Sequence, residues 1–126
     1  MELFTEAQFE QLIKNGRDRN PNKDQIPVVK LFMSFTACSW LISELDPEDP
    51  DIAFGLCDLG MGFPEIGYVS ISELIEAQDL LRFLERDMFF LGKYPLSVYA
   101  KFAHQLEHIE TDDDAGLRRI KNAPRP

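Results

Sequence analysis

Residues 27–45 read PVVKLFMSFTACSWLISEL, and this stretch decides the fold class. Its two halves, 27–35 and 39–45, are rich in β-branched and aromatic residues, which favour strands. Only Thr-Ala-Cys separates the two halves. Because antiparallel strands can be joined by a short turn and parallel strands cannot, we expect an antiparallel pair.

The same pattern continues downstream. ELDPEDPD (44–51) is a turn, because its two prolines and five acidic residues cannot continue a strand ladder. IAFGLCDL (52–59) predicts a third strand, GMGFP (60–64) a glycine turn and EIGYVS (65–70) a fourth strand. Closely spaced strands with short links predict an antiparallel meander.

Helices flank the predicted sheet. FTEAQF (4–9) combines a Thr–Gln capping box with two phenylalanines at staple positions, so a first helix starts at Thr5. A second helix begins near Ser70; it either continues through Arg86 or ends early and leaves a fifth strand over Leu84–Phe90. Pro95 begins a last helix. Its apolar stripe is Tyr99, Phe102, Ala103, Leu106 and Ile109.

We therefore predict an α+β fold: an antiparallel meander of four to five strands, an N-terminal helix, a helix after strand four and a C-terminal helix. One domain covers residues 1–110, and the polar, proline-tipped residues 111–126 form a mobile tail. We expect most aromatic residues on the predicted strands to be buried. They are Trp40, Phe54, Tyr68 and Phe89.

The composition excludes several classes of protein. Two cysteines, Cys38 and Cys57, are too few for a disulfide scaffold. The first ten residues, MELFTEAQFE, carry acids where a secretion signal carries bases. No stretch approaches the roughly 20 apolar residues of a membrane span. We expect a cytoplasmic protein with free thiols, no membrane attachment and no cofactor.

The net charge of −9 is unevenly distributed. Residues 31–114 contain 17 acidic and four basic residues, so this part should repel nucleic-acid phosphates. The acidic turn is instead a candidate docking site for a partner protein with a basic surface. Its carboxylates are Glu44, Asp46, Glu48, Asp49 and Asp51. Two alternatives remain: acidity that serves solubility alone, and nucleic-acid contact through basic arms at Lys14–Lys30 and Arg118–Arg125.

HQLEH (104–108) matches the inverted zinc-hydrolase pattern H-x-x-E-H and contains the only two histidines. On the predicted last helix, His104 and His108 fall opposite the apolar stripe, so we expect both to be exposed and without a structural metal. We predict no catalytic residue. The alternative is a small metal-dependent hydrolase that uses His104, Glu107 and His108.

Several motifs resemble a known family. They are Trp40 followed by acidic residues, FGL (54–56), IGYVSISEL (66–74), ERDMFF (85–90) and PLS (95–97). In this order and spacing the chain is similar to the small bacterial family catalogued as domain of unknown function twenty-nine fifty-eight. The likeness covers Val28 to Ser97. The resemblance implies that members end near Ser97, which leaves HQLEH outside the family pattern, and it favours a strand at Glu85–Phe90.

The resemblance also implies a biological setting. Family members are encoded on plasmids, integrative elements and phages, and the family has no agreed activity, cofactor or catalytic residues to transfer. Together with the acidic turn, this predicts a non-catalytic interaction protein of a mobile element. The expected partner class is a host nucleic-acid or defence enzyme. The sequence does not indicate an oligomeric state.

Overall fold

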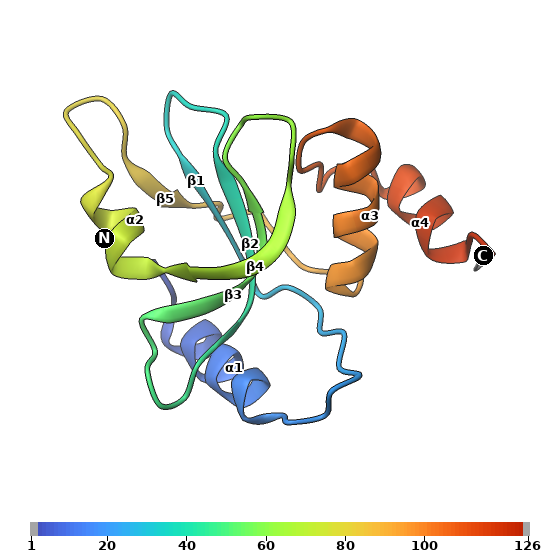
Figure 1. Ribbon diagram of the computed structural model, residues 1–126, viewed down its shortest axis with the longest axis horizontal. Helices are drawn as coiled ribbons and strands as arrows, with labels where there is room; N and C mark the ends of the chain where they lie inside the picture. Colours follow the sequence, from blue (N-terminus) through green and yellow to red (C-terminus); the bar gives the residue numbers. More distant parts are fainter. Residues whose placement is uncertain (1–2, 125–126) are drawn as a thin grey trace.

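The computed structural model describes residues 3–124 and has the predicted α+β fold (Figure 1). In chain order the elements are α1 (Glu6–Arg17), β1 (Val29–Met33), β2 (Ser39–Leu45), β3 (Ile52–Asp58), β4 (Glu65–Ser70), α2 (Ile71–Glu76), β5 (Leu84–Arg86), α3 (Leu96–Leu106) and α4 (Asp114–Asn122). No helix in the described part of the chain is long and apolar enough to cross a membrane.

The five strands form one antiparallel sheet in the order β4-β3-β2-β1-β5. Strands β1 to β4 are the expected meander. After β4 the chain returns through α2 to the opposite edge, where Leu31 of β1 pairs with Arg86 of β5. The alternative of a helix through Arg86 is therefore wrong: α2 ends at Glu76, and Leu84–Arg86 is a short strand.

Helices pack on both faces of this sheet. One core cluster contains residues of α1 and α2, and the other contains residues of α3 and α4. In β2, Trp40 and Ile42 belong to the first cluster and Leu41 to the second. Burial of both faces explains why Trp40, Leu41 and Ile42 are three apolar residues in a row and do not alternate with polar ones.

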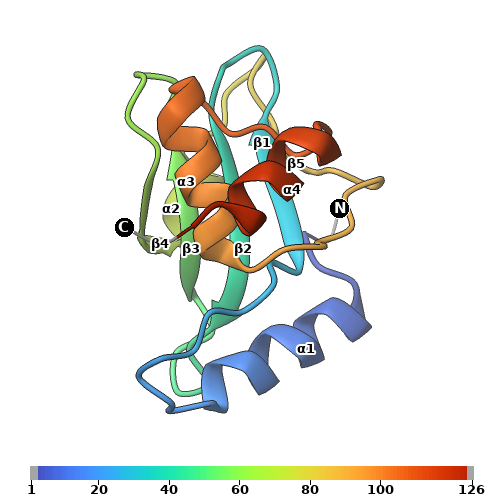
Figure 2. The same cartoon turned by 90° about the vertical axis from the view of Figure 1, so that its right-hand side faces the viewer.

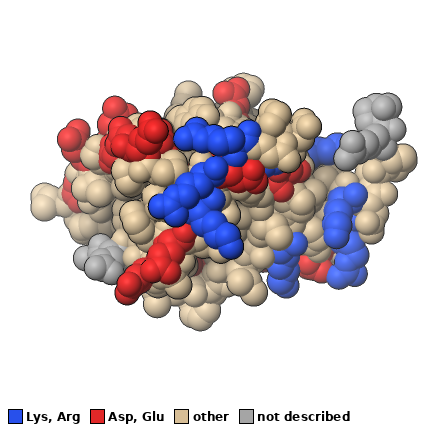
Figure 3. All heavy atoms as spheres, turned by 90° about the horizontal axis from the view of Figure 1, so that it is seen from below, with Lys and Arg blue, Asp and Glu red and all other residues tan. Residues whose placement is uncertain are grey.

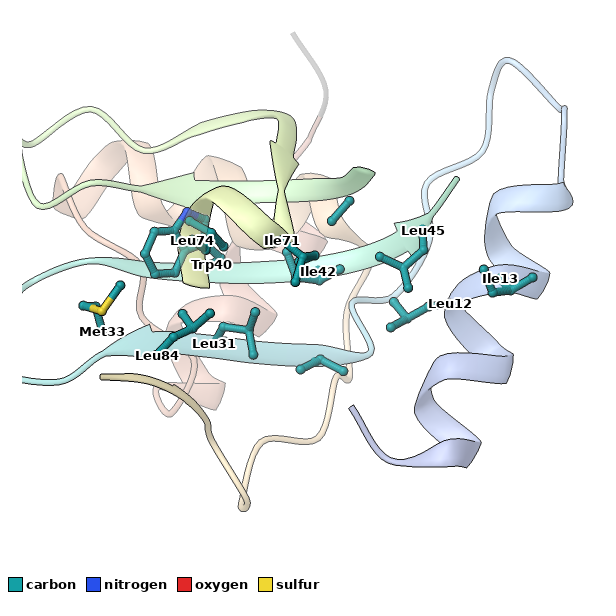
Figure 4. Packing of buried hydrophobic residues seen from close by; sticks show 12 residues of the cluster. Leu12, Ile13, Leu31, Met33, Trp40, Ile42, Leu45, Ile71, Leu74 and Leu84 are labelled. Carbon is teal, nitrogen blue, oxygen red and sulfur yellow. The ribbon is translucent and has the colours of Figure 1, made fainter. Parts of the chain in front are cut away.

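The first cluster joins the N-terminal helix to the sheet. In Figure 4, Leu12 of α1 points toward Leu45 of β2, and Leu74 of α2 lies beside Trp40. Helix α1 begins with the predicted capping box, in which the Thr5 hydroxyl accepts from the backbone of Gln8 at 3.1 Å. The sequence thus places the start of α1 correctly.

The chain after residue 110 differs from the expected mobile tail. Residues 114–122 form α4, and Figure 2 shows it beside α3 in front of the sheet. Asp113 caps the helix by accepting from the backbone N–H of Gly116 at 2.9 Å. Leu117 and Ile120 are buried against the second cluster. Only two apolar residues, at positions i and i+3, mark the buried side of α4. Among the charged residues around them, this amphipathic pattern is too weak to predict a helix from the sequence.

The expectation for the strand aromatics was also wrong. Trp40 is buried and Phe54 is half-buried, but the Tyr68 side chain is 75% exposed and Phe89 is 96% exposed. Tyr68 lies on the edge strand β4, where the sheet has no further strand to cover it. Phe89 lies after β5 in the link to α3, outside any strand.

Candidate functional site

One end of the sheet carries a group of exposed apolar side chains, and we call it the apolar end. It consists of three loops: 34–38 between β1 and β2, 59–64 between β3 and β4, and 77–83 between α2 and β5 (top of Figure 1). Their exposed large apolar residues are Phe35, Leu59, Met61, Phe63, Leu80, Leu81 and Phe83. Exposed apolar side chains that gather on one part of a protein often mark an interaction site.

Hydrogen bonds hold these loops side by side. The Ser34 backbone N–H donates to the Phe83 carbonyl at 2.8 Å, and the Phe83 N–H donates to the Ser34 hydroxyl at 2.8 Å. On the other side, the Cys38 thiol lies 3.4 Å from the Leu59 carbonyl. A Cβ added to Gly60 would lie 2.9 Å from the Cβ of Ala37. The three loops therefore present one surface.

A buried carboxylate supports the apolar end from beneath. Asp58, at the end of β3, is 2% exposed. Its Oδ1 accepts from the Gly60 N–H at 2.8 Å, and its Oδ2 accepts from the Ile109 N–H at 3.0 Å. Asp58 thus ties loop 59–64 to the segment that follows α3. Gly60 and Gly62 have φ of 77° and 86°, a conformation that favours glycine.

Loop 77–83 has its own internal support. Asp79 accepts from the backbone N–H groups of Leu81 and Arg82 at 3.0 and 2.9 Å, and it pairs with the Arg82 guanidinium. The bond from the Arg82 side chain, with the two backbone bonds, lowers the pKa of Asp79 to about 2. This network fixes the loop in a conformation that leaves the Leu80 side chain 92% exposed.

Phe35 is the most informative residue of the apolar end. Its φ is 58°, a left-handed conformation that is uncommon for a bulky side chain. Its ring is 87% exposed, so burial does not offset the strain. Strained backbone that the surrounding contacts maintain is frequent at functional sites.

The acidic turn predicted as a docking site lies at the opposite end of the sheet. Glu44 pairs with Lys23 at 2.7 Å and is mostly buried. Asp51 accepts from the Ser70 hydroxyl at 2.6 Å and from the Ser72 N–H at 2.8 Å. These bonds, with that of Ser70 the largest, lower the pKa of Asp51. The exposed carboxylates of the turn are those of Asp46, Glu48 and Asp49.

HQLEH does not form the geometry of its motif. Helix α3 ends at Leu106, and Glu107 has a left-handed φ of 65°, so the helix that would align the two histidines stops between them. The expected helical stripe through Ile109 was therefore too long. His104 and His108 are exposed, as predicted. Within residues 3–124, no three His, Cys, Asp or Glu side chains are grouped closely enough to hold a metal ion.

The basic arms are partly engaged in the fold. Lys23 pairs with Glu44, and Lys30 donates to the Thr111 hydroxyl at 3.0 Å. In the second arm Arg118 pairs with Asp114, and Arg125 lies outside the described residues. Figure 3 shows Lys and Arg side chains interrupted by acidic and uncharged ones on the face seen from below. The carboxylates beside these basic side chains oppose the approach of a phosphate backbone to that face.

The apolar end is not predictable from the sequence because its residues are of the types that usually form a core. Leu80 and Leu81 in particular keep helical spacing with Leu84, so they fit the alternative of a helix through Arg86. Phe35 was assigned to the end of a strand, whereas β1 ends at Met33.

A sequence model of the family described as Protein of unknown function (DUF2958) matches residues 3–110, and the chain therefore belongs to this family. The match extends beyond Val28–Ser97 at both ends. It includes HQLEH, so the expectation that this motif lies outside the family pattern was wrong. No curated protein and no solved structure matches the chain.

Proposed function

We propose that this member of the DUF2958 family is a non-catalytic interaction protein that docks on a protein partner through the apolar end. The observation that carries the proposal is the group of exposed apolar side chains on three loops, of which loop 34–38 hydrogen-bonds to each of the other two. Prearranged loops lose little conformational entropy on association, which favours binding. Aromatic residues such as Phe35 and Phe63 are typical of the buried centre of an interface.

Charge supports a basic partner. Glu65 follows loop 59–64 directly, and Glu76 ends α2 just before loop 77–83. Glu107 also borders the apolar end, because a Cβ added to Gly62 would lie 3.6 Å from its carboxylate. The only arginine of the three loops, Arg82, pairs with Asp79. An acidic rim around an apolar centre matches a partner with an apolar hollow and a basic rim.

We further propose that the partner is a host nucleic-acid or defence enzyme, as the mobile-element setting of the family suggests. Such enzymes carry Lys and Arg surfaces that neutralise phosphates. An acidic protein with an apolar contact surface can occupy such a surface and exclude nucleic acid. Like-charge repulsion makes a second copy of this chain, with its net charge of −9, a poorer occupant.

The test combines partner capture with a matched pair of variants. A protein captured from host lysate is purified, and its Kd for this chain is measured at low and high salt. Phe35→Asn with Leu80→Ser removes two exposed side chains of the apolar end. Phe89→Ser removes a comparably exposed ring outside the apolar end.

We expect the double variant to weaken binding by about 30-fold or more, as for hot-spot residues. Phe89→Ser should change the Kd by less than about twofold, and added salt should weaken binding. Equal affinity of the double variant and the unsubstituted protein would exclude the apolar end as the docking surface. Binding that is insensitive to salt would exclude the basic partner.

A further inference from the structure

The edge strand β4 is open for pairing with another strand. It has six residues and stands first in the sheet order, so only β3 borders it. In Figure 2 it forms the left border of the sheet, with α3 in front of the neighbouring strands. The opposite edge is β5, which has only three residues. The longer edge is the one able to bind an extended segment.

The register shows which backbone groups of β4 face outward. The Ile71 N–H donates to the Asp51 carbonyl at 2.8 Å, and the register continues without a shift through Ala53–Val69 and Gly55–Gly67. Antiparallel pairing alternates, so these odd-numbered β4 residues bond to β3. The N–H and C=O groups of Ile66 and Tyr68 therefore point away from the sheet.

The usual protections of an edge strand are missing from β4. Its sequence, EIGYVS, contains no proline, lysine or arginine. Its pairing with β3 contains no bulge. A Cβ added to Gly67 would meet nothing within 4 Å. Proline, lysine, bulges and covering elements are the devices that keep strands from pairing with an exposed edge.

A groove lined by both apolar and polar side chains lies beside this edge. The rings of Phe54 and Tyr68 lie 5.0 Å apart, and with Ile66 they line a cavity of about 560 Å³ between the sheet, loop 18–25 and the start of α3. A second hollow of about 520 Å³ lies at the other end of β4, between Glu65 and Glu107. An added strand would place alternate side chains along these hollows.

Among the charged residues that line the two hollows, acidic ones predominate. The carboxylates belong to Asp18, Asp24, Glu44, Asp46, Glu65 and Glu107. The lysine and arginine among the lining residues are Lys23, which pairs with Glu44, and Arg19. A segment with basic residues at its ends complements these walls. A second copy would bring its own Glu65 against an already acidic edge.

We infer that β4 binds an extended segment of a partner protein by strand addition. On the groove side the segment carries two large apolar residues at its centre and Lys or Arg at both ends. Main-chain hydrogen bonds to Ile66 and Tyr68 provide affinity, and the groove selects the side chains. The inference rests on the proposed role as an interaction protein, and its surface meets the apolar end only at loop 59–64.

The test uses the whole chain and a labelled probe peptide, acetyl-Lys-Thr-Val-Thr-Phe-Thr-Lys-amide, in a fluorescence-anisotropy titration. Two further peptides carry N-methyl groups either on the Lys, Val and Phe nitrogens or on the Thr nitrogens. Only one of these sets can point toward β4, because backbone groups alternate along a strand. One methylated peptide should bind like the parent and the other should not bind, and the set that fails gives the strand orientation. Equal behaviour of the two peptides overturns strand addition.

Substitutions on β4 provide the second arm. Tyr68→Pro removes an outward N–H and leaves the bonds of Gly67 and Val69 to β3 in place. It should weaken peptide binding about tenfold or more relative to Tyr68→Ala, which keeps that N–H. Equal affinities of the two variants argue against strand addition. If Tyr68→Pro fails to fold, as judged by circular dichroism, the methylated peptides still decide.

Two controls separate this inference from its competitors. The peptide with Glu in place of Lys should bind about tenfold more weakly, and equal binding overturns the charge assignment. A concentration-dependent dimer that Tyr68→Ala retains and Tyr68→Pro abolishes would assign the edge to a second copy. Phe35→Asn with Leu80→Ser should bind the peptide normally, so failure of the apolar end and failure of the β4 edge give different results.

Discussion

The two ends of the sheet differ in the kind of side chain that reaches solvent. At the β2–β3 turn, Glu44 and Asp51 bond to Lys23 and to Ser70 and Ser72. At the apolar end, loops with satisfied backbone groups project large apolar side chains outward. Two carboxylates of the acidic turn, which its charge marks as a docking site, are therefore bonded within the fold. At the apolar end, by contrast, residues of the types usual in a core are exposed.

Backbone position decides the role of these residues more than their type does. Asp51 stands where α2 begins, so its carboxylate meets the N–H and hydroxyl groups of the first helical turn. Phe35 stands in a left-handed turn after β1, so its ring cannot return to the core. Substitutions at the two ends should therefore have opposite consequences for stability and for binding.

The largest contrast comes from the same substitution at both ends. Leu12 of α1 is fully buried near the β2–β3 end, so Leu12→Ala should lower the free energy of unfolding by about 2–5 kcal/mol. Leu80→Ala at the apolar end should change it by no more than about 0.5 kcal/mol. Urea denaturation of the two variants measures both values. Similar losses would mean that the loops pack in solution and that the contrast is false.

Asp58 is the one position at the apolar end where we expect a substitution to destabilise the fold strongly, because its buried carboxylate anchors loop 59–64. Asp58→Ala leaves the N–H groups of Gly60 and Ile109 without their acceptor, and we expect a loss of about 2–3 kcal/mol in the free energy of unfolding. Asp58→Asn keeps one amide oxygen and should lose less. Unchanged stability of Asp58→Ala would mean that the loops are not anchored from beneath.

Local sequence signals predicted most of the fold. Capping residues at Thr5 and Ser70 and the strand patterns over 27–70 depend on neighbours in the chain, and the structure confirms them. The return of β5 to the edge of β1 is a tertiary choice that no local pattern contains. α4 was missed because only Leu117 and Ile120 mark its buried side.

The candidate site was less predictable for a physical reason. The residue type of a Phe or Leu in a loop does not show whether its side chain is exposed or buried. Only the arrangement of loops 34–38, 59–64 and 77–83 shows that these side chains are exposed. HQLEH shows the converse error. Its spacing brings the two histidines to one face only on a continuous helix, and α3 ends within the motif.

The acidic turn should reveal its structural role through pH. The pKa of Asp51 is lowered in the folded protein, so folding favours the ionised carboxylate. Its stabilisation is present above the unfolded value of 3.8 and is lost as the pH falls through the lower folded value. Asp51→Asn should therefore be less stable than the unsubstituted protein at pH 7, and the two should converge in acid.

Chemical denaturation of both proteins from pH 7 to pH 2 provides the measurement for Asp51. Glu48→Gln, an exposed position on the same turn, serves as the control and should stay within about 0.5 kcal/mol of the unsubstituted protein at pH 7. A constant difference between Asp51→Asn and the unsubstituted protein at every pH would show that the charge of Asp51 does not act on the fold.

The smallest effect concerns Phe35, and its sign is the sharpest test of the comparison. The left-handed φ of 58° strains any residue with a Cβ, and the exposed ring contributes little burial to offset it. Phe35→Gly should thus raise the free energy of unfolding by up to about 1 kcal/mol, because glycine adopts this conformation freely. Phe35→Ala keeps the Cβ and should be nearly neutral, so the pair separates backbone strain from the loss of the ring. Thermal and urea unfolding of both variants give the two differences.

If Phe35→Gly instead destabilises the protein by more than about 1 kcal/mol, the ring packs against its neighbours and Phe35 belongs to the fold, as Leu12 does. If it stabilises while partner binding is lost, the residue is retained at a cost to stability, which is the behaviour expected of a binding residue.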